Sequence, residues 1–254
     1  MPGSKVVRSV DRALEIVELL ARSERPQTLA ELSATLDIPK STLHALLWTL
    51  TGRGWIESDE ASGRFRIGLH ALLVGRSYVE SDNLVALAAA VLDQLAAETG
   101  ETVHLGRLDG TSIVYLDKRE SVHPLRLFSA IGRHLPAFTT ALGKSILAGL
   151  PDDQLETHLP RPLTRLTPHT IADLKALRAD LALTRERGYA VDNEENSEGI
   201  KGFAVALGTT NPPHDAVSCA IPIARLHDDT EEAVVARLRE AAGRINGRVS
   251  SRAF

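Results

Sequence analysis

The chain is 254 residues long, with 43% hydrophobic and 24% charged residues and a formal net charge of -4. This composition excludes a disordered or fibrous chain, and the length suggests two globular domains. A single cysteine, Cys219, excludes an intrachain disulfide and a thiolate metal cluster, so we expect a cytoplasmic protein. No signal-peptide core follows Met1, and the most apolar stretch, residues 84–92, falls short of the ~20 residues that cross a bilayer.

Two short helices are expected at the beginning of the chain. Apolar residues at helical spacing predict a helix over residues 7–23, and Pro26 prevents its continuation. Thr28 followed by Glu31 is the pattern of a capping box, which predicts a second helix to about residue 35.

A third helix follows a turn at residues 37–39. We expect Pro39 in its first turn, where the missing N–H costs no hydrogen bond. Gly52 and Gly54 end this helix after about residue 51, and its spacing predicts a buried face formed by Leu43, Leu46, Leu47 and Leu50.

The pattern then alternates with a period of two, over residues 55–57 and 64–67, around a turn at 59–63. This alternation predicts a β-hairpin. Three short helices closed by a hairpin are typical of a winged helix-turn-helix domain, here expected over residues 5–68.

The rest of the chain predicts a linker helix at residues 69–82 and a second domain over residues 83–254. The linker's helical pattern covers 69–80, and polar residues 81–83 mark the boundary. Mixed elements favour an α+β domain with one antiparallel sheet flanked by helices. We expect helices near 84–98, 140–149, 171–187 and 229–248, and strands near 102–108, 112–117, 125–128, 203–207 and 216–221.

Several segments together resemble IclR-type transcriptional regulators. In the first domain these are residues 10–14, 29–32, 38–44, 54–57 and 63–68, and in the second they are residues 135–144 and 187–195. The resemblance covers nearly the whole chain. It implies a bacterial repressor or activator with a winged DNA-binding domain, a GAF-like effector-binding domain and a homodimeric or homotetrameric assembly.

The expected DNA contacts lie at the start of the third helix and on the hairpin. A recognition helix places its first residues against base edges and phosphates, and the residues there are Lys40, Ser41, Thr42 and His44. Arg64 and Arg66 lie two apart on one strand, where a wing can grip the minor groove. The alternative is that Ser41 and Thr42 cap the helix and that the arginines lie on a solvated strand. Ala45 stands where the family often carries arginine.

The resemblance also implies an effector pocket lined by Ala141, Leu142, Asp192, Gly202, Ser218 and Ala220. Backbone N–H groups at a helix start near residues 141–142 suit an anion. Two alternatives stay open: Ser218 as an ordinary strand residue, and Asp192 in a solvated acidic turn. Gly202, Phe203, Gly208-Thr209 and Ala220 depart from the family pattern and suggest fewer polar anchors and a larger or more apolar ligand than a two- or three-carbon acid.

An enzyme is the competing class of function, and the sequence argues against it. Residues 143–145 resemble the end of a phosphate-binding loop, but Phe138 replaces its first glycine. Residues 192–196 faintly resemble a calcium loop but lack its later glycine. The histidines show no metal-binding spacing, and Cys219 reads as a core residue. We therefore expect no enzyme activity, metal or cofactor; an enzyme acting on a small acid and a ligand-independent DNA-binding protein remain the alternatives.

The expected partners are an operator in double-stranded DNA, a small effector (an organic acid or a larger apolar metabolite) and further copies of the chain, with no membrane. Residues 1–68 carry nine Lys plus Arg and nine Asp plus Glu, whereas residues 69–254 carry twenty and twenty-four. DNA affinity must therefore depend on where the few cations point, and it should fall steeply with salt. The helices at 7–23 and 84–95 are the candidate subunit contacts; the alternative is that both pack inside one chain.

Overall fold

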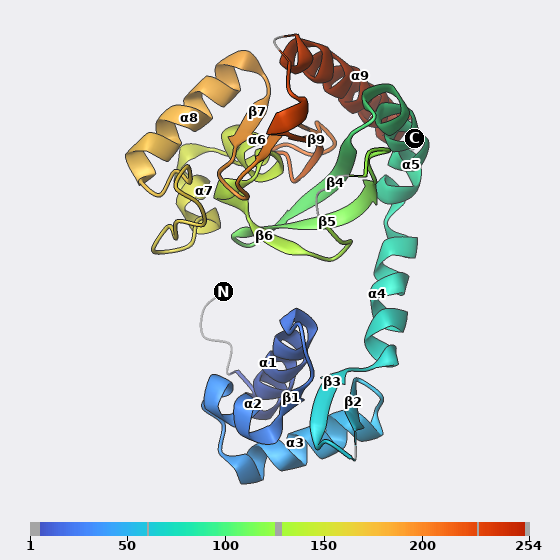
Figure 1. Ribbon diagram of the computed structural model, residues 1–254, viewed down its shortest axis with the longest axis vertical. Helices are drawn as coiled ribbons and strands as arrows, with labels where there is room; N and C mark the ends of the chain where they lie inside the picture. The colour runs from blue at the N-terminus through green and yellow to red at the C-terminus, as the bar shows by residue number, and fades with distance from the viewer. Residues whose placement is uncertain (1–5, 60, 125–128, 228, 252–254) are drawn as a thin grey trace. The chain divides into compact units, whose positions relative to one another are not determined.

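The computed structural model describes residues 6–59, 61–124, 129–227 and 229–251 (Figure 1). The chain divides into two compact units, Met1–Ser81 and Asp82–Phe254, here called the N-terminal and C-terminal units. Each unit has its own hydrophobic core.

In its described residues, the N-terminal unit contains four helices and a small antiparallel sheet with strand order β1-β3-β2. A core of leucine and isoleucine residues, including Ile16, Leu32, Leu43 and Leu47, joins the first three helices to the sheet. The elements are α1 (Arg8–Arg22), β1 (Gln27–Thr28), α2 (Leu29–Leu36), α3 (Lys40–Gly52), β2 (Ile56–Asp59), β3 (Arg64–Ile67) and α4 (Leu69–Ser81).

Local chemistry explains where these helices begin and end. The expected capping box is present, because the Thr28 side chain accepts from the Glu31 N–H and the Glu31 carboxylate accepts from the Thr28 N–H. Asp37, in the left-handed region at φ 51°, ends α2 and allows the short turn to α3. The placement of Pro39 in the first turn was wrong: it is the N-cap of α3, and its carbonyl accepts from the Leu43 N–H.

The C-terminal unit is built on a six-stranded antiparallel sheet with strand order β6-β5-β4-β9-β8-β7. Figure 1 shows α5 and α9 on one side of this sheet and α6 and α8 on the other. Each pair packs against its own buried apolar cluster. The strands are β4 (Thr102–Asp109), β5 (Ser112–Arg119), β6 (His134–Pro136), β7 (Ala190–Asn193), β8 (Ile200–Ala206) and β9 (Asp215–Pro222); the helices are α5 (Asn83–Thr99), α6 (Ala141–Gly149), α7 (Asp152–Leu155), α8 (Leu174–Arg187) and α9 (Thr230–Ser250).

The expected α+β class is confirmed, with differences at particular elements. Helix α8 begins at Leu174 instead of residue 171, because the Asp173 side chain caps it by accepting from the Ala176 N–H at 2.8 Å. Strands β6 and β7 were not predicted, since neither residues 134–136 nor residues 190–193 alternate regularly between apolar and polar residues. The strand expected at residues 125–128 lies outside the described residues.

Candidate functional site

The first candidate site is the outer surface of α3. Its inner face buries Leu43, Leu47 and Leu50, and the four predicted DNA contacts on this helix, Lys40, Ser41, Thr42 and His44, are all exposed. The N-cap is Pro39, which makes no side-chain capping bond. The alternative that Ser41 and Thr42 cap the helix is therefore wrong, and both hydroxyls face solvent.

The two arginines of the hairpin lie on β3 and are already engaged by neighbouring groups. The Arg64 Nη1 donates to the Pro26 carbonyl at 2.9 Å and lies 3.6 Å from a Glu31 carboxylate oxygen. Arg66 lies opposite Glu57 in the β2–β3 register and donates twice to its carboxylate, from Nε at 2.9 Å and from Nη2 at 2.7 Å. Part of the positive charge on this hairpin is thus neutralised within the unit.

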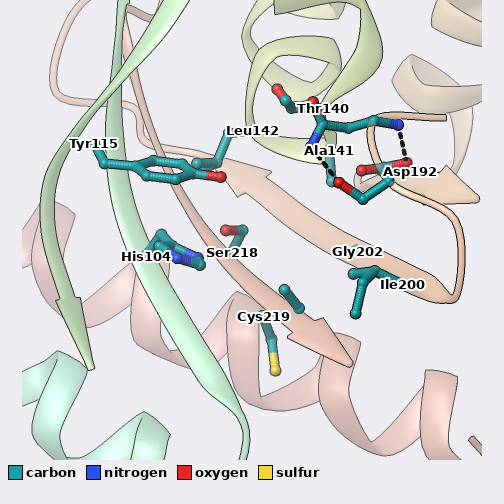
Figure 2. A pocket seen from close by; sticks show the side chains of 13 residues that line it. His104, Tyr115, Thr140, Ala141, Leu142, Asp192, Ile200, Gly202, Ser218 and Cys219 are labelled. Atoms are coloured by element: carbon teal, nitrogen blue, oxygen red, sulfur yellow. Dashed lines mark hydrogen bonds between the residues drawn. The ribbon is translucent and has the colours of Figure 1, made fainter. Parts of the chain in front are cut away.

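The second candidate site is a cavity of about 30 Å³ in the C-terminal unit, between the sheet and the start of α6 (Figure 2). All six predicted effector residues line it: Ala141, Leu142, Asp192, Gly202, Ser218 and Ala220. An ideal Cβ built on Gly202 would lie 3.4 Å from the Cβ atoms of Ala141 and Asp192. Glycine at this position therefore leaves open the space between helix and strand.

Helix α6 presents unpaired backbone donors to the cavity. Its N-cap Thr140 accepts from the Gly143 N–H at 3.0 Å, and the Lys144 N–H donates to the Thr140 carbonyl at 2.9 Å. Across the described part of the chain, no acceptor meets the N–H groups of Ala141 and Leu142, although both residues are buried. A helix start with two free N–H groups is suited to a carboxylate or another anion.

The opposite wall of the cavity carries polar groups that the sequence analysis missed. His104 on β4 stacks on Tyr115 of β5, with ring centroids 4.3 Å apart, and its Nε2 lies 2.9 Å from the Ser129 hydroxyl. Burial, reinforced by the charge of Lys118, lowers the pKa of His104 to about 3, so the ring is neutral at pH 7. Figure 2 shows these two rings and Asp192 on opposite sides of Ser218 in this view.

Two hydroxyl groups at the cavity wall are ready to bond a ligand. Tyr115 and Ser218 are 6% and 5% exposed, and neither side chain hydrogen-bonds to a described residue. Burial raises the pKa of Tyr115 to about 12, which keeps its proton available for donation. Each can therefore donate to or accept from an oxygen of a bound molecule.

The cavity lining contradicts the expectation of few polar anchors. Seven of its thirteen residues are polar: His104, Tyr115, Thr140, Asp192, Asn196, Ser197 and Ser218. The departures at Gly202 and Ala220 removed side chains on β8 and β9, but β4 and β5 supply others. His104 on β4 and Tyr115 on β5 lie on strands that also carry core residues, so a single sequence gives no signal that separates them from the core.

A group of buried charges lies beside the cavity, where Glu195 adjoins the lining residue Asn196. The Lys144 ammonium is fully buried and pairs with the carboxylates of Glu195 and, at 2.9 Å, Asp180 on α8. This engagement leaves Lys144 unable to serve a phosphate-binding loop. Burial of an ion costs several kcal/mol unless it is paired, so these contacts fix the position of α6.

Asp192 is a buried residue of β7, 7% exposed, and the alternative of a solvated turn was wrong for it. Its Oδ1 accepts from the backbone N–H of Glu195 at 2.8 Å and of Asn196 at 3.3 Å. Burial, together with the negative charge of Glu195, raises the pKa of Asp192 to about 7. The carboxyl group therefore shifts between its neutral and charged forms near neutral pH.

Comparison with known proteins identifies the family. Residues 76–247 match the model of the bacterial transcriptional regulator IclR C-terminal family, and residues 9–60 match the IclR helix-turn-helix domain. The HTH-type transcriptional regulator XynR of Escherichia coli K12 is 36% identical over 237 residues, which cover 92% of each chain. The chain belongs to the IclR family of bacterial transcriptional regulators. Its helix-turn-helix domain indicates DNA binding.

Solved IclR structures share the fold. An IclR transcriptional regulator from Alicyclobacillus acidocaldarius superimposes with a TM-score of 0.84 at 28% identity, covering 96% of this chain and 99% of the other. An IclR homologue from Microbacterium hydrocarbonoxydans, crystallised in complex with 4-hydroxybenzoate, gives a TM-score of 0.79 at 22% identity, covering 96% and 99%. The latter identity supports the common fold alone.

Two further features concern the single cysteine of this IclR-family protein and the length of its apolar helices. Burial raises the pKa of the Cys219 thiol to about 12, which keeps it protonated and unreactive. No helix among the described residues is long and apolar enough to cross a membrane.

Proposed function

We propose that this IclR-family protein is a cytoplasmic regulator whose residues 5–68 bind operator DNA, with residues 69–82 as a linker helix. Residues 83–254 then bind a small effector and hold the subunits together. The observation that carries the DNA-binding role is the exposed beginning of α3, where Lys40, Ser41, Thr42 and His44 all face solvent. Arg64 and Arg66 contribute once phosphates replace Glu31 and Glu57 as their partners.

Apolar residues on the N-terminal unit support a homodimer or homotetramer. On α1, Val10 and Leu14 are each 56% exposed and border an apolar groove of about 520 Å³ that also includes Trp55. Helix α4 buries none of its residues, and Leu69 and Leu72 on it are 65% and 66% exposed. Such extended apolar surface is typical of a site where another protein surface packs, and a second copy of the chain fits the paired half-sites that helix-turn-helix proteins read.

The polar lining of the cavity favours a small organic acid over a larger apolar metabolite. A carboxylate at the Ala141 and Leu142 N–H groups, with Ser218 and Tyr115 bonding its other oxygens, would satisfy donors that are otherwise unpaired. A space of about 30 Å³ holds only one or two water molecules, so effector binding must move the lining outward. This movement would link the cavity to the rest of the regulator, since a ligand favours whichever conformation it fits better.

The DNA contacts can be tested on sites selected from a random duplex library. Lys40→Ala and Arg64→Ala should weaken binding to all sequences and lower the salt slope by about one unit each, because each removes a phosphate contact. His44→Ala should instead change the preferred bases. Arg22→Ala, on α1, is the matched control for loss of a cation. Unchanged affinity for Lys40→Ala and Arg64→Ala in a gel-shift titration would refute the assignment.

The assembly can be tested by sedimentation equilibrium. The wild type should sediment as two or four chains, and Leu14→Glu should lower that mass because it places a charge in the α1 contact. Thr35→Glu on α2, an exposed polar position that does not line the α1 groove, is the control and should keep the wild-type mass. A wild type that sediments as one chain, both alone and on DNA, rules out the proposed assembly.

The effector class can be tested by a thermal-shift screen of 2-oxo acids and aromatic acids, including 4-hydroxybenzoate. A true effector binds the folded chain and should raise its melting temperature by several degrees at saturation. Ser218→Ala should reduce that shift, whereas Ser112→Ala, outside the cavity lining, should not. The proposed acid site is wrong if no acid raises the melting temperature of the wild type, or if Ser218→Ala shows the full wild-type shift. The first of these results favours a ligand-independent DNA-binding protein.

A further inference from the structure

Trp48 is a large apolar side chain that the helix α3 exposes to solvent. It is 77% exposed, whereas Trp55, the other tryptophan, packs edge-on against His70 with ring centroids 5.1 Å apart. Tryptophan is on average a well-buried residue. Trp48 does not line the apolar groove beside α1, so the proposed subunit contact does not account for its exposure.

The position of Trp48 on α3 places it at the centre of the outer face. Ser41, Ala45, Trp48 and Gly52 follow one another at intervals of four, three and four residues, opposite the buried Leu43, Leu47 and Leu50. Three of these four outer residues are small. The indole, the one large group among these four residues, therefore projects furthest from this face of the helix.

The chemistry of α3 is suited to an apolar contact at this point. Lys40 is the only Lys, Arg, Asp or Glu in the helix. It is the first residue of α3, whereas Trp48 lies in the third turn. Trp48 lies seven positions after Ser41 along the helix, a rise of about 10 Å. This rise corresponds to roughly three base pairs of duplex, so Trp48 faces a different base step from Ser41.

We propose that Trp48 is a specificity-determining residue of α3 that packs its indole against the C5-methyl group of a thymine in the major groove. The thymine methyl is the apolar group that base edges present there, and apolar side chains are its usual partners. The inference rests on the proposed DNA-binding function of α3. It adds to the predicted base contact of His44 a second, apolar contact one turn further along the helix.

The test asks whether removing the thymine methyl group weakens binding only when Trp48 is present. Sites are first selected by the wild type from a random duplex library, and the conserved thymines are then replaced one at a time by deoxyuridine, which removes only the methyl. One replacement should weaken wild-type binding about fivefold or more, within the usual range for one altered base pair. Trp48→Ala should bind the thymine and deoxyuridine sites equally, and Trp48→Phe should keep part of the difference.

The controls separate this inference from the function on which it rests. Thr49→Ala changes a neighbouring exposed side chain whose hydroxyl donates to the Ala45 carbonyl and which lines the groove beside α1. Its response to deoxyuridine, measured as the ratio of affinities for the two sites, should equal that of the wild type. The high exposure of Trp48 means that its replacement leaves the core intact. Equal melting temperatures for all the variants check that folding is unchanged.

Two results would overturn the inference while leaving the DNA-binding function in place. One is a Trp48→Ala variant that keeps the wild-type response to every deoxyuridine. The other is a variant with unchanged base preference but a lower sedimenting mass, which would assign Trp48 to a contact between chains. A wild type that selects no site at all would refute the DNA-binding function itself, and this inference with it.

Discussion

The C-terminal unit depends on one fully buried cation and the carboxylates around it. Lys144 extends from α6 to Glu195, in the turn after β7, and to Asp180 on α8, so a single ammonium joins three segments that are distant in sequence. Its burial is tolerable only while these partners stay in place. The start of α6 and the end of β7 are held together as a result, and the cavity lies between them.

The same sheet connects the cavity to the beginning of the C-terminal unit. Strands β4 and β9 contribute His104 and Ser218 to the cavity wall. They also carry Arg107 and Asp215, which form a bidentate ion pair, and Arg107 further binds Asp82. Asp82 caps α5 and is the first residue after α4. If a bound effector changed the spacing of β4 and β9, Arg107 would move, and its contact with Asp82, where the two units join, would change with it.

Local sequence signals predicted much of this structure, and the failures have physical reasons. The Thr28–Glu31 capping box and the buried leucines of α3 depend on short-range spacing, which a sequence displays directly. The six effector positions came from family resemblance, and the fold brings all of them to one cavity. His104 and Tyr115 were missed because strand alternation does not distinguish a cavity wall from a core. The burial of Asp192 was missed because it depends on β7, a four-residue strand without apolar–polar alternation, pairing with β8.

The central claim is that Asp192 is a buried carboxyl group confined beside Glu195, and the pH dependence of unfolding tests it most directly. Because the folded pKa, about 7, lies above the ordinary value of 3.8, Asp192 favours folding below about pH 4 and loses this contribution as pH rises through 7. Neutral, buried His104 acts in the opposite direction, losing stability as pH falls below 6.5, so the comparison must be with Asp192→Asn. The unfolding free energy of Asp192→Asn minus that of the wild type should be about 2.5 kcal/mol larger at pH 8 than at pH 5. A difference that stays constant across this range would contradict the account.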